Sequence, residues 1–142
     1  MTPGCTTYQL WMWLERPGEI PVGRLGSCAF PRGWYVYTGS ARRNMAARLR
    51  RHCRSDADKR LRWHIDYFLA LAACRILYIS GSQVPECNLN AATGGRIVCA
   101  GLGASDCRSG CGSHLRYLGA AFSLEDLLEA RTPQGLDPEI RT

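Results

Sequence analysis

Lysine is almost absent from this chain, because Lys59 is the only lysine among 18 basic residues. No apolar run approaches the roughly 20 residues that a membrane-spanning helix needs, and the N-terminus lacks the basic start and apolar stretch of a signal peptide. No long polar tract, internal repeat or linker interrupts the 142 residues, which argues against disorder and against a second domain. We therefore expect one ordered cytoplasmic domain without membrane association.

Arginine takes the place of lysine, and its distribution along the chain is uneven. The net charge is +6, and nine basic residues but only two acids, Asp56 and Asp58, lie between Arg42 and Arg62. A guanidinium grips phosphate through two parallel hydrogen bonds, so a cationic stretch of this kind suits a phosphate polymer. The charge pattern alone fits equally well an arginine-rich surface that only faces solvent.

Eight cysteines raise the question of disulfides and metal sites. Without an export signal, and with several cysteines inside apolar runs, reduced and mostly buried thiols are expected. The spacing Cys107-x3-Cys111-x2-His114 suggests zinc, with Cys87 or Cys99 as a conceivable fourth ligand. Zinc sites usually have regular pairs at both ends, and here the pair is irregular, so packed loop thiols are favoured over a structural zinc.

The apolar pattern predicts the secondary structure and the fold class. The expected strands are 8–14, 20–25, 34–38, 75–80, 96–100 and 114–118, with loops at 26–33 and 101–113. The expected helices are 44–54, 58–73, a short one opened by Pro85 and closed by Gly94, and 123–131. This order predicts an α/β (α+β) fold with a small mixed or antiparallel sheet flanked by helices. The domain is expected over residues 1–132, with a C-terminal tail over 133–142.

Residues with chemical potential gather after the strand expected at 34–38. That strand ends at Gly39, where the missing side chain leaves room for a ligand, and a helix follows. Arg48 and His52 are four residues apart and share one face of this helix, so they can converge with Tyr37 on one phosphate. By composition alone, the ordinary alternative of a strand tyrosine beside an exposed arginine-rich helix is favoured.

Two tyrosine triplets and an ordered set of six segments carry a family resemblance. Tyr37-Thr38-Gly39 is similar to the second half of the GIY-YIG nuclease motif, and Thr6-Thr7-Tyr8 is similar to its first half. The six segments, which cover nearly the whole chain in order, are 22–26, 35–41, 50–52, 63–67, 86–87 and 103–107 with 113–115. The chain therefore resembles the GIY-YIG nuclease family and, more narrowly, its small standalone Uri-type branch.

The resemblance implies a phosphodiester hydrolase that uses one divalent ion, Mg²⁺ or Mn²⁺. Tyr8 matches the tyrosine proposed as general base or water-positioner, and Tyr37 matches the tyrosine that orients the phosphate or water. Arg48 matches the arginine that stabilises added negative charge on the phosphate, and His52 matches a partner of phosphate or tyrosine. Glu86, at a helix start, matches the metal-binding glutamate. An ordinary phenol has a pKa of about 10, so Tyr8 needs nearby positive charge to act as a base.

DNA is the expected partner, while RNA and the oligomeric state stay open. Nucleic-acid contacts are expected from Ser40, Arg42, Arg43, Arg50, Arg51, Arg60, Arg62 and His64. His64 fits a partly buried structural role at least as well, and Asp66 is expected to pair with an arginine. Without an added recognition domain, strong sequence specificity is not expected. The alternatives are a non-catalytic nucleic-acid-binding module on the same fold and, on the cysteine count alone, a redox or metal-storage protein.

Overall fold

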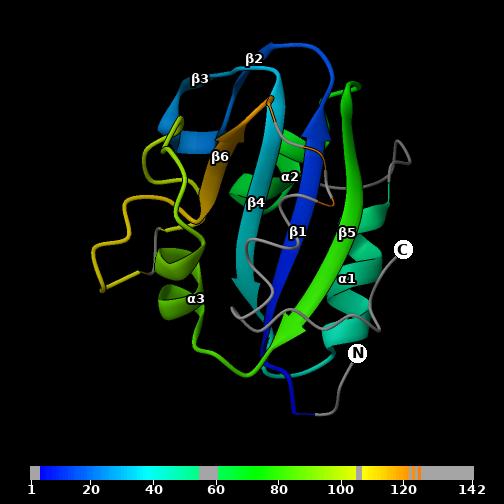
Figure 1. Ribbon diagram of the computed structural model, residues 1–142, viewed down its shortest axis with the longest axis vertical. Helices are drawn as coiled ribbons and strands as arrows, with labels where there is room; N and C mark the ends of the chain where they lie inside the picture. The colour runs from blue at the N-terminus through cyan, green and yellow to red at the C-terminus, as the bar shows by residue number, and fades with distance from the viewer. Residues whose placement is uncertain (1–3, 55–60, 105–106, 122, 124, 126–142) are drawn as a thin grey trace.

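A computed structural model describes residues 4–54, 61–104, 107–121, 123 and 125. Within this part the chain forms an α+β domain with a four-stranded antiparallel sheet, ordered β5-β1-β4-β6, and a separate β2–β3 hairpin (Figure 1). The strands are β1 (Thr7–Leu14), β2 (Gly18–Pro21), β3 (Ser27–Phe30), β4 (Gly33–Ser40), β5 (Cys74–Ser82) and β6 (Leu115–Gly119). The helices are α1 (Met45–Cys53), α2 (His64–Leu69) and α3 (Glu86–Thr93), with a 3-10 turn at Gly23–Leu25.

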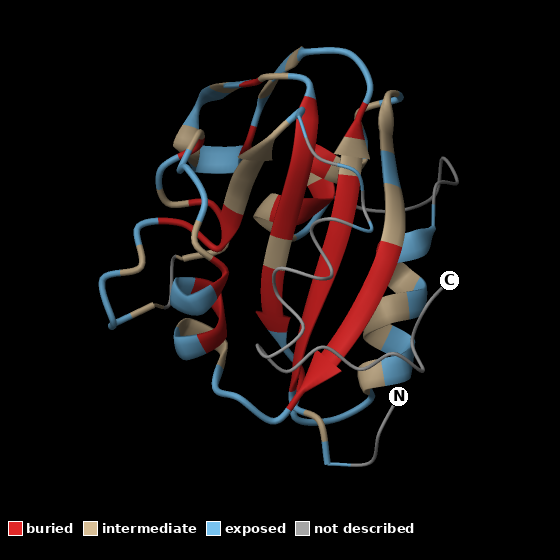
Figure 2. Ribbon diagram, in the orientation of Figure 1, coloured by how far each residue is buried: buried red, intermediate tan, exposed pale blue. Residues whose placement is uncertain are grey.

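Strand β1 is central, because it pairs with β4 on one side and with β5 on the other. It is rich in large apolar residues and buried along nearly its whole length, as is most of β4 (Figure 2). The register places Tyr8 opposite Gly39 and Leu10 opposite Tyr37. Both tyrosines of the motif therefore lie at the same end of the sheet.

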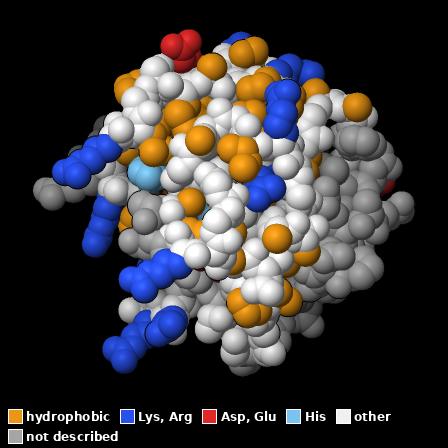
Figure 3. Space-filling view, turned by 90° about the vertical axis from the view of Figure 1, so that its left-hand side faces the viewer, with side chains coloured by type: hydrophobic (Ala, Val, Ile, Leu, Met, Phe, Trp, Pro, Cys, Tyr) orange, Lys and Arg blue, Asp and Glu red, His pale blue; other side chains and the backbone are white. Residues whose placement is uncertain are grey.

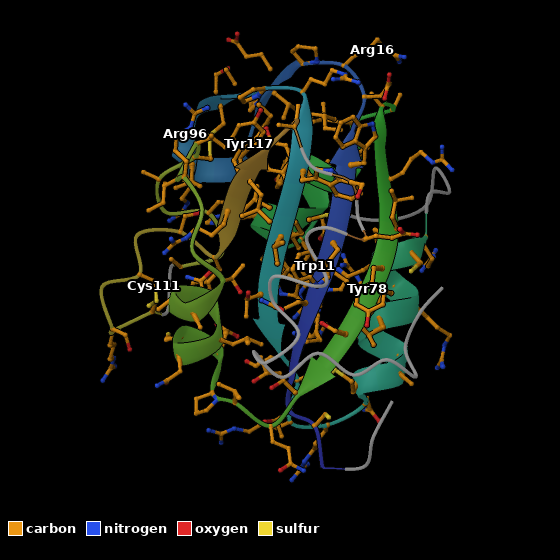
Figure 4. The ribbon with its side chains drawn as sticks, viewed as in Figure 1. Trp11, Arg16, Tyr78, Arg96, Cys111 and Tyr117 are labelled. Atoms are coloured by element: carbon orange, nitrogen blue, oxygen red, sulfur yellow. A yellow bond between two sulfur atoms is a disulfide. The ribbon has the colours of Figure 1, made fainter. Side chains whose placement is uncertain are left out.

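Side chains of β1 alternate between two apolar layers, as the period of a strand requires. Leu10 belongs to the main core, where apolar residues of α1 and α2 pack against the sheet, and Figure 1 shows both helices behind it. Trp11 belongs to a smaller cluster on the opposite face, where it meets Tyr78 of β5 edge to face (Figure 4). The two covered faces explain why β1 reads as a continuous apolar run.

Helix α3 lies beside β4 (Figure 1) and is fixed there by buried polar contacts. Gln9 of β1 donates a hydrogen bond from Nε2 to Thr93 Oγ1 at 2.7 Å. Asn90 donates from Nδ2 to the carbonyl oxygen of Ser113 at 3.0 Å. These bonds hold α3 against the sheet and against the segment that leads into β6.

The fold class is confirmed, but the hairpin differs from the expected strand at 20–25 and the expected loop at 26–33. Strand β2 ends before that range does, and β3 pairs with β2 where a loop is expected. The chain reverses through the 3-10 turn and Gly26, whose φ of 80° favours glycine. Because this turn interrupts the apolar stretch, two short strands replace one.

Two further elements differ from the sequence-based expectation. The helix expected at 58–73 is shorter: residues 61–63 and 70–73 are not helical, and 55–60 lie outside the described residues. The strand expected at 96–100 is reduced to a single bridge between Arg96 and Tyr117. Gly94 and Gly95 both have positive φ, so the chain leaves α3 through a turn that directs residues 97–100 away from the sheet.

The remaining expectations concern the chain end, the membrane and the cysteines. Most of the expected helix at 123–131 and the tail at 133–142 lie outside the described residues. No helix in the described part of the chain is long and apolar enough to cross a membrane. A disulfide joins Cys28 and Cys99, so the prediction of reduced thiols is wrong for this pair. The other six cysteines form no disulfide within the described residues, and they are partly or fully exposed, so the prediction of mostly buried thiols is wrong.

Candidate active site

A pocket of about 570 Å³ opens at the end of the sheet where β1 begins and β4 ends. Four of the five residues predicted to act in catalysis lie in its wall; they are Tyr8, Tyr37, Arg48 and Glu86. The fifth, His52, is buried and contacts Tyr8. The other lining residues are Ser40, Arg62, Trp63, His64, Cys87, Gly103, Cys107 and Arg108. The structure thus brings the predicted residues together, while their chemical roles stay predictions.

Tyr8 fits into the site because its partner across the strands is a glycine. A Cβ atom added to Gly39 would lie 2.6 Å from both Cζ and the hydroxyl oxygen of Tyr8 and 3.0 Å from a ring carbon of Tyr37. Heavy atoms at such distances overlap, so any side chain at position 39 would displace the tyrosine rings. The glycine of the motif is therefore required for the close approach of the two tyrosines.

The hydroxyl group of Tyr8 lies 2.7 Å from Nε2 of His52, at hydrogen-bond distance. Burial raises the pKa of Tyr8 to about 12, although the neighbouring Arg48 acts in the opposite direction. Burial also raises the pKa of Tyr37. Both phenols are therefore protonated at neutral pH, and Arg48 does not by itself make Tyr8 a base.

Arg48 enters the pocket from α1 and is held at two points. Its Nη1 donates a hydrogen bond to the carbonyl oxygen of Ser40 at 3.0 Å. Its guanidinium carbon lies 4.5 Å from the ring centre of Trp63, which is a cation–π distance. A guanidinium with these two contacts is a preorganised positive charge facing the tyrosines.

Glu86 is the first residue of α3, and it faces His114, which directly precedes β6. Its Oε2 lies 2.7 Å from Nδ1 of His114. Burial alone would raise the pKa of Glu86, but hydrogen bonds from His114 and Ser40 outweigh burial and lower it. Burial would lower the pKa of His114, yet its contact with Glu86 and those with the cysteines raise it to about 9. The pocket therefore holds an ionised carboxylate at neutral pH.

Asp66 holds Arg51 and the backbone around Trp63 in place. Asp66 is buried and binds Arg51 through two hydrogen bonds of 2.8 and 2.9 Å, which confirms the expected pairing with an arginine. It also accepts hydrogen bonds from the backbone N–H groups of Arg62 and Trp63, both at 2.8 Å. Burial would raise the pKa of Asp66, but the bonds from Arg51 and these N–H groups lower it.

The residues predicted to bind nucleic acid fall into different environments. Arg51 is predicted to contact phosphate, but Asp66 neutralises its charge and its guanidinium carbon lies 4.3 Å from the ring centre of Trp63. The first role of Arg51 is therefore structural. His64 lines the pocket while its Nδ1 accepts a hydrogen bond from the N–H of Gly103 at 3.1 Å. Arg60 lies outside the described residues. Exposed side chains are those of Ser40, Arg42, Arg43, Arg50 and Arg62.

Arginine side chains lie around the pocket. In the view of Figure 3, which faces this side of the molecule, Lys and Arg side chains line one margin and acidic side chains are sparse. Arg108 of the loop lines the pocket together with Arg62. The mouth of the pocket is therefore positively charged, as an electrostatic site for phosphate requires.

A group of thiols lies next to the pocket. Atoms of Cys87, Cys107, Cys111 and His114 that can bind metal all lie within 4.8 Å of one another. Figure 4 shows Cys111 in the loop beside α3. Hydrogen bonds from the backbone N–H groups of Cys111 and Ser109 lower the pKa of Cys107 to about 6. The group could therefore hold a metal ion, and its fourth member beside Cys107, Cys111 and His114 is Cys87.

Sequence reasoning missed two contributors to the site and left a third open. No sequence signal singles out Trp63, yet its ring lies within cation–π distance of both Arg48 and Arg51. Arg108 lies in the segment expected to be a loop, yet it lines the pocket. Cys87 was considered as a zinc ligand only in competition with Cys99, which the disulfide removes. Its position directly after Glu86 was the signal that linked it to the site.

Comparison with known proteins identifies the family. The chain matches the family described as Domain of unknown function DUF123 over residues 7–134, and it belongs to that family. Searches of curated proteins and of solved structures found no match.

Proposed function

We propose that this protein is a metal-dependent endonuclease that hydrolyses phosphodiester bonds in DNA, on a GIY-YIG-type fold of the Uri-type branch. The observation that carries the proposal is the convergence of two tyrosines, one arginine and one carboxylate on a single pocket; they are Tyr8, Tyr37, Arg48 and Glu86. They come from four separate elements, so chain proximity alone does not explain their meeting. Positive charge around the mouth favours a polyanionic substrate.

Glu86 is the residue that would hold a divalent ion. Its carboxylate is ionised and its side chain is 26% exposed, so an oxygen can reach a ligand in the pocket. Hard carboxylate oxygen suits Mg²⁺ or Mn²⁺. When bound, such an ion supplies Lewis-acid polarisation of a phosphate oxygen. A carboxylate beside a phosphate-binding face repels nucleic acid unless a cation intervenes, which favours an enzyme over a binding module.

Tyr8 and His52 together can move the proton of the attacking water. The pKa of about 12 keeps the phenol protonated, so it acts through its hydrogen bond to His52 Nε2 at 2.7 Å. When Tyr8 donates this bond, His52 carries its own proton on Nδ1. As the water oxygen attacks phosphorus, the water proton passes to the Tyr8 oxygen and the phenol proton passes to Nε2. One P–O bond breaks, and the leaving oxygen takes a proton from solvent.

Arg48 and Tyr37 act on the phosphate itself. The developing transition state carries added negative charge, which a preorganised guanidinium stabilises without reorganisation. The contacts of Arg48 with the Ser40 carbonyl and the Trp63 ring hold its guanidinium in this orientation. The protonated hydroxyl of Tyr37 can donate a hydrogen bond to a phosphate oxygen or orient the water. Arg62 and Arg108 line the same pocket and can contact flanking phosphates.

The test is a cleavage assay with the pure protein on labelled single-stranded, duplex and flapped DNA and on RNA, each with Mn²⁺ or with EDTA. We expect cleavage of at least one DNA substrate with Mn²⁺ and none with EDTA. Salt-dependent binding without any cleavage would replace the enzyme by a nucleic-acid-binding module. Absence of both binding and cleavage would overturn the proposal altogether.

A further inference from the structure

Two distances within the group of four metal-binding side chains next to the pocket match the edges of a tetrahedral zinc site. The Sγ atoms of Cys87 and Cys107 lie 3.6 Å apart, and Cys87 Sγ lies 3.8 Å from His114 Nε2. With Zn–S bonds of about 2.3 Å and a Zn–N bond of about 2.0 Å, the edges of a tetrahedral zinc site are about 3.8 Å and 3.6 Å. The distance between the Sγ atoms of Cys87 and Cys107 is also far longer than the roughly 2.05 Å of a disulfide bond.

We propose that Cys87, Cys107, Cys111 and His114 bind one Zn²⁺ ion in a closed tetrahedral site. Three thiolates and one imidazole suit zinc in preference to Mg²⁺ or Ca²⁺, which take oxygen ligands. Four protein ligands leave no position for water or substrate, so the site is structural. The ion ties the start of α3 to the loop before β6, and this loop carries Arg108 into the pocket.

The zinc site shares its histidine with the candidate active site. Nε2 of His114 faces the cysteines, and Nδ1 lies 2.7 Å from Oε2 of Glu86. Zinc on Nε2 leaves the proton on Nδ1, directed at the carboxylate, which is the usual arrangement of a carboxylate behind a zinc-bound histidine. Glu86 therefore contacts the histidine that binds zinc and also lines the pocket. The idea that His114 orients Glu86 for catalysis rests on the proposed function, whereas the proposal of zinc binding does not.

The direct test is the metal content of the purified protein, measured by mass spectrometry of the metals after dialysis. We expect about one zinc per chain in the wild type and in the control Cys53→Ser, because Cys53 is exposed and lies outside the cluster. We expect a loss of most of the zinc in Cys107→Ser and in Cys111→Ser. A wild type without zinc, or variants that keep it fully, would overturn the site.

Cobalt substitution protects the test against misfolding of the cysteine variants. The wild-type protein, depleted of zinc and reloaded with Co²⁺, should show intense visible absorption of tetrahedral thiolate coordination together with a thiolate charge-transfer band. An octahedral cobalt spectrum, or a disulfide between two of the cluster cysteines in the purified protein, would refute the proposal. Either result is independent of whether the protein cleaves DNA.

The link to Glu86 has its own measurement. Glu86→Gln should still bind one zinc per chain, but with roughly ten- to a hundredfold weaker affinity in a chelator competition, because the histidine loses its charged partner. Glu19→Gln, at an exposed glutamate on the hairpin, is the matched control and should leave the affinity unchanged. Unchanged zinc affinity in Glu86→Gln would remove the coupling and leave the zinc site standing.

Discussion

Replacing Asp66 by alanine should destabilise the protein more than any change at the surface. The carboxylate has no exposed side-chain area, while the side chain of its partner Arg51 is 22% exposed. Besides Arg51, the backbone N–H groups of Arg62 and Trp63 donate to it. Removing one partner of a buried ion pair leaves the other uncompensated, at a cost of about 3–5 kcal/mol. For a chain of this size the melting temperature should fall by roughly 10–15 °C.

The assay is thermal unfolding at neutral pH followed by circular dichroism, with Glu19→Gln as the exposed control, which should change stability by less than about 0.5 kcal/mol. Arg51→Ala should produce much of the same loss, and the double variant only slightly more, because the two side chains act as a pair. A melting temperature within about 3 °C of the wild type in Asp66→Ala would refute the reasoning.

The ion pair of Asp66 and Arg51 also predicts how stability responds to acid. Because the pKa of Asp66 is lowered in the folded state, its stabilisation is fully present above the unfolded value of about 3.9 and is lost as the pH falls through the folded value. The stability difference between the wild type and Asp66→Ala should therefore narrow in strong acid. A difference that is constant from neutral pH to strong acid would contradict this.

Three further predictions concern the pocket. Gly39→Ala should displace Tyr8, cost about 1–3 kcal/mol of stability and reduce cleavage; a normal melt and rate would contradict the close approach. Arg48→Lys should slow cleavage about a hundredfold while DNA binding persists, and an unchanged rate would argue against a bidentate phosphate contact. In a salt titration, Arg50→Ala should make the plot of log affinity against log salt shallower by about the amount expected for one lost phosphate contact. Arg51→Ala should leave this slope unchanged, because Asp66 neutralises the charge of Arg51. Equal slopes for Arg50→Ala and the wild type would argue against a phosphate contact by Arg50.

The sheet and the main helix follow closely from the sequence. The many apolar residues of β1 and β4 predict buried strands, and Gly39 predicts the turn into α1. The hairpin was harder, because the 3-10 turn at Gly23–Leu25 splits a short apolar stretch that reads as one strand. The shortened α2 begins where the Asp66 carboxylate accepts hydrogen bonds from the N–H groups of Trp63 and Arg62. This cap is local, but the sequence pattern does not reveal it, because the cap position holds Trp63 and not the usual serine or threonine.

Residues of the site could be predicted from the sequence where they belong to a motif. They could not be predicted where their role depends on tertiary contacts. Tyr8 and Glu86 were singled out by resemblance, and the structure places both at one pocket. The partner of Arg51 was not visible from charge counting, which made this residue look like a phosphate ligand. The choice between Cys87 and Cys99 as the fourth ligand of the cluster also depends on the fold, because local spacing carries no information about residues 20 positions apart.

The central claim is that Glu86 holds the divalent ion used in cleavage. It is tested most directly by the single-turnover cleavage rate of Glu86→Gln with Mn²⁺ on a DNA that the wild type cleaves. Zinc content and DNA affinity are measured on the same samples. The account predicts a loss of cleavage of at least about a hundredfold, with DNA affinity preserved and one zinc still bound under zinc-saturating conditions. Glu19→Gln should cleave like the wild type. A Glu86→Gln variant that cleaves at the wild-type rate would contradict the account.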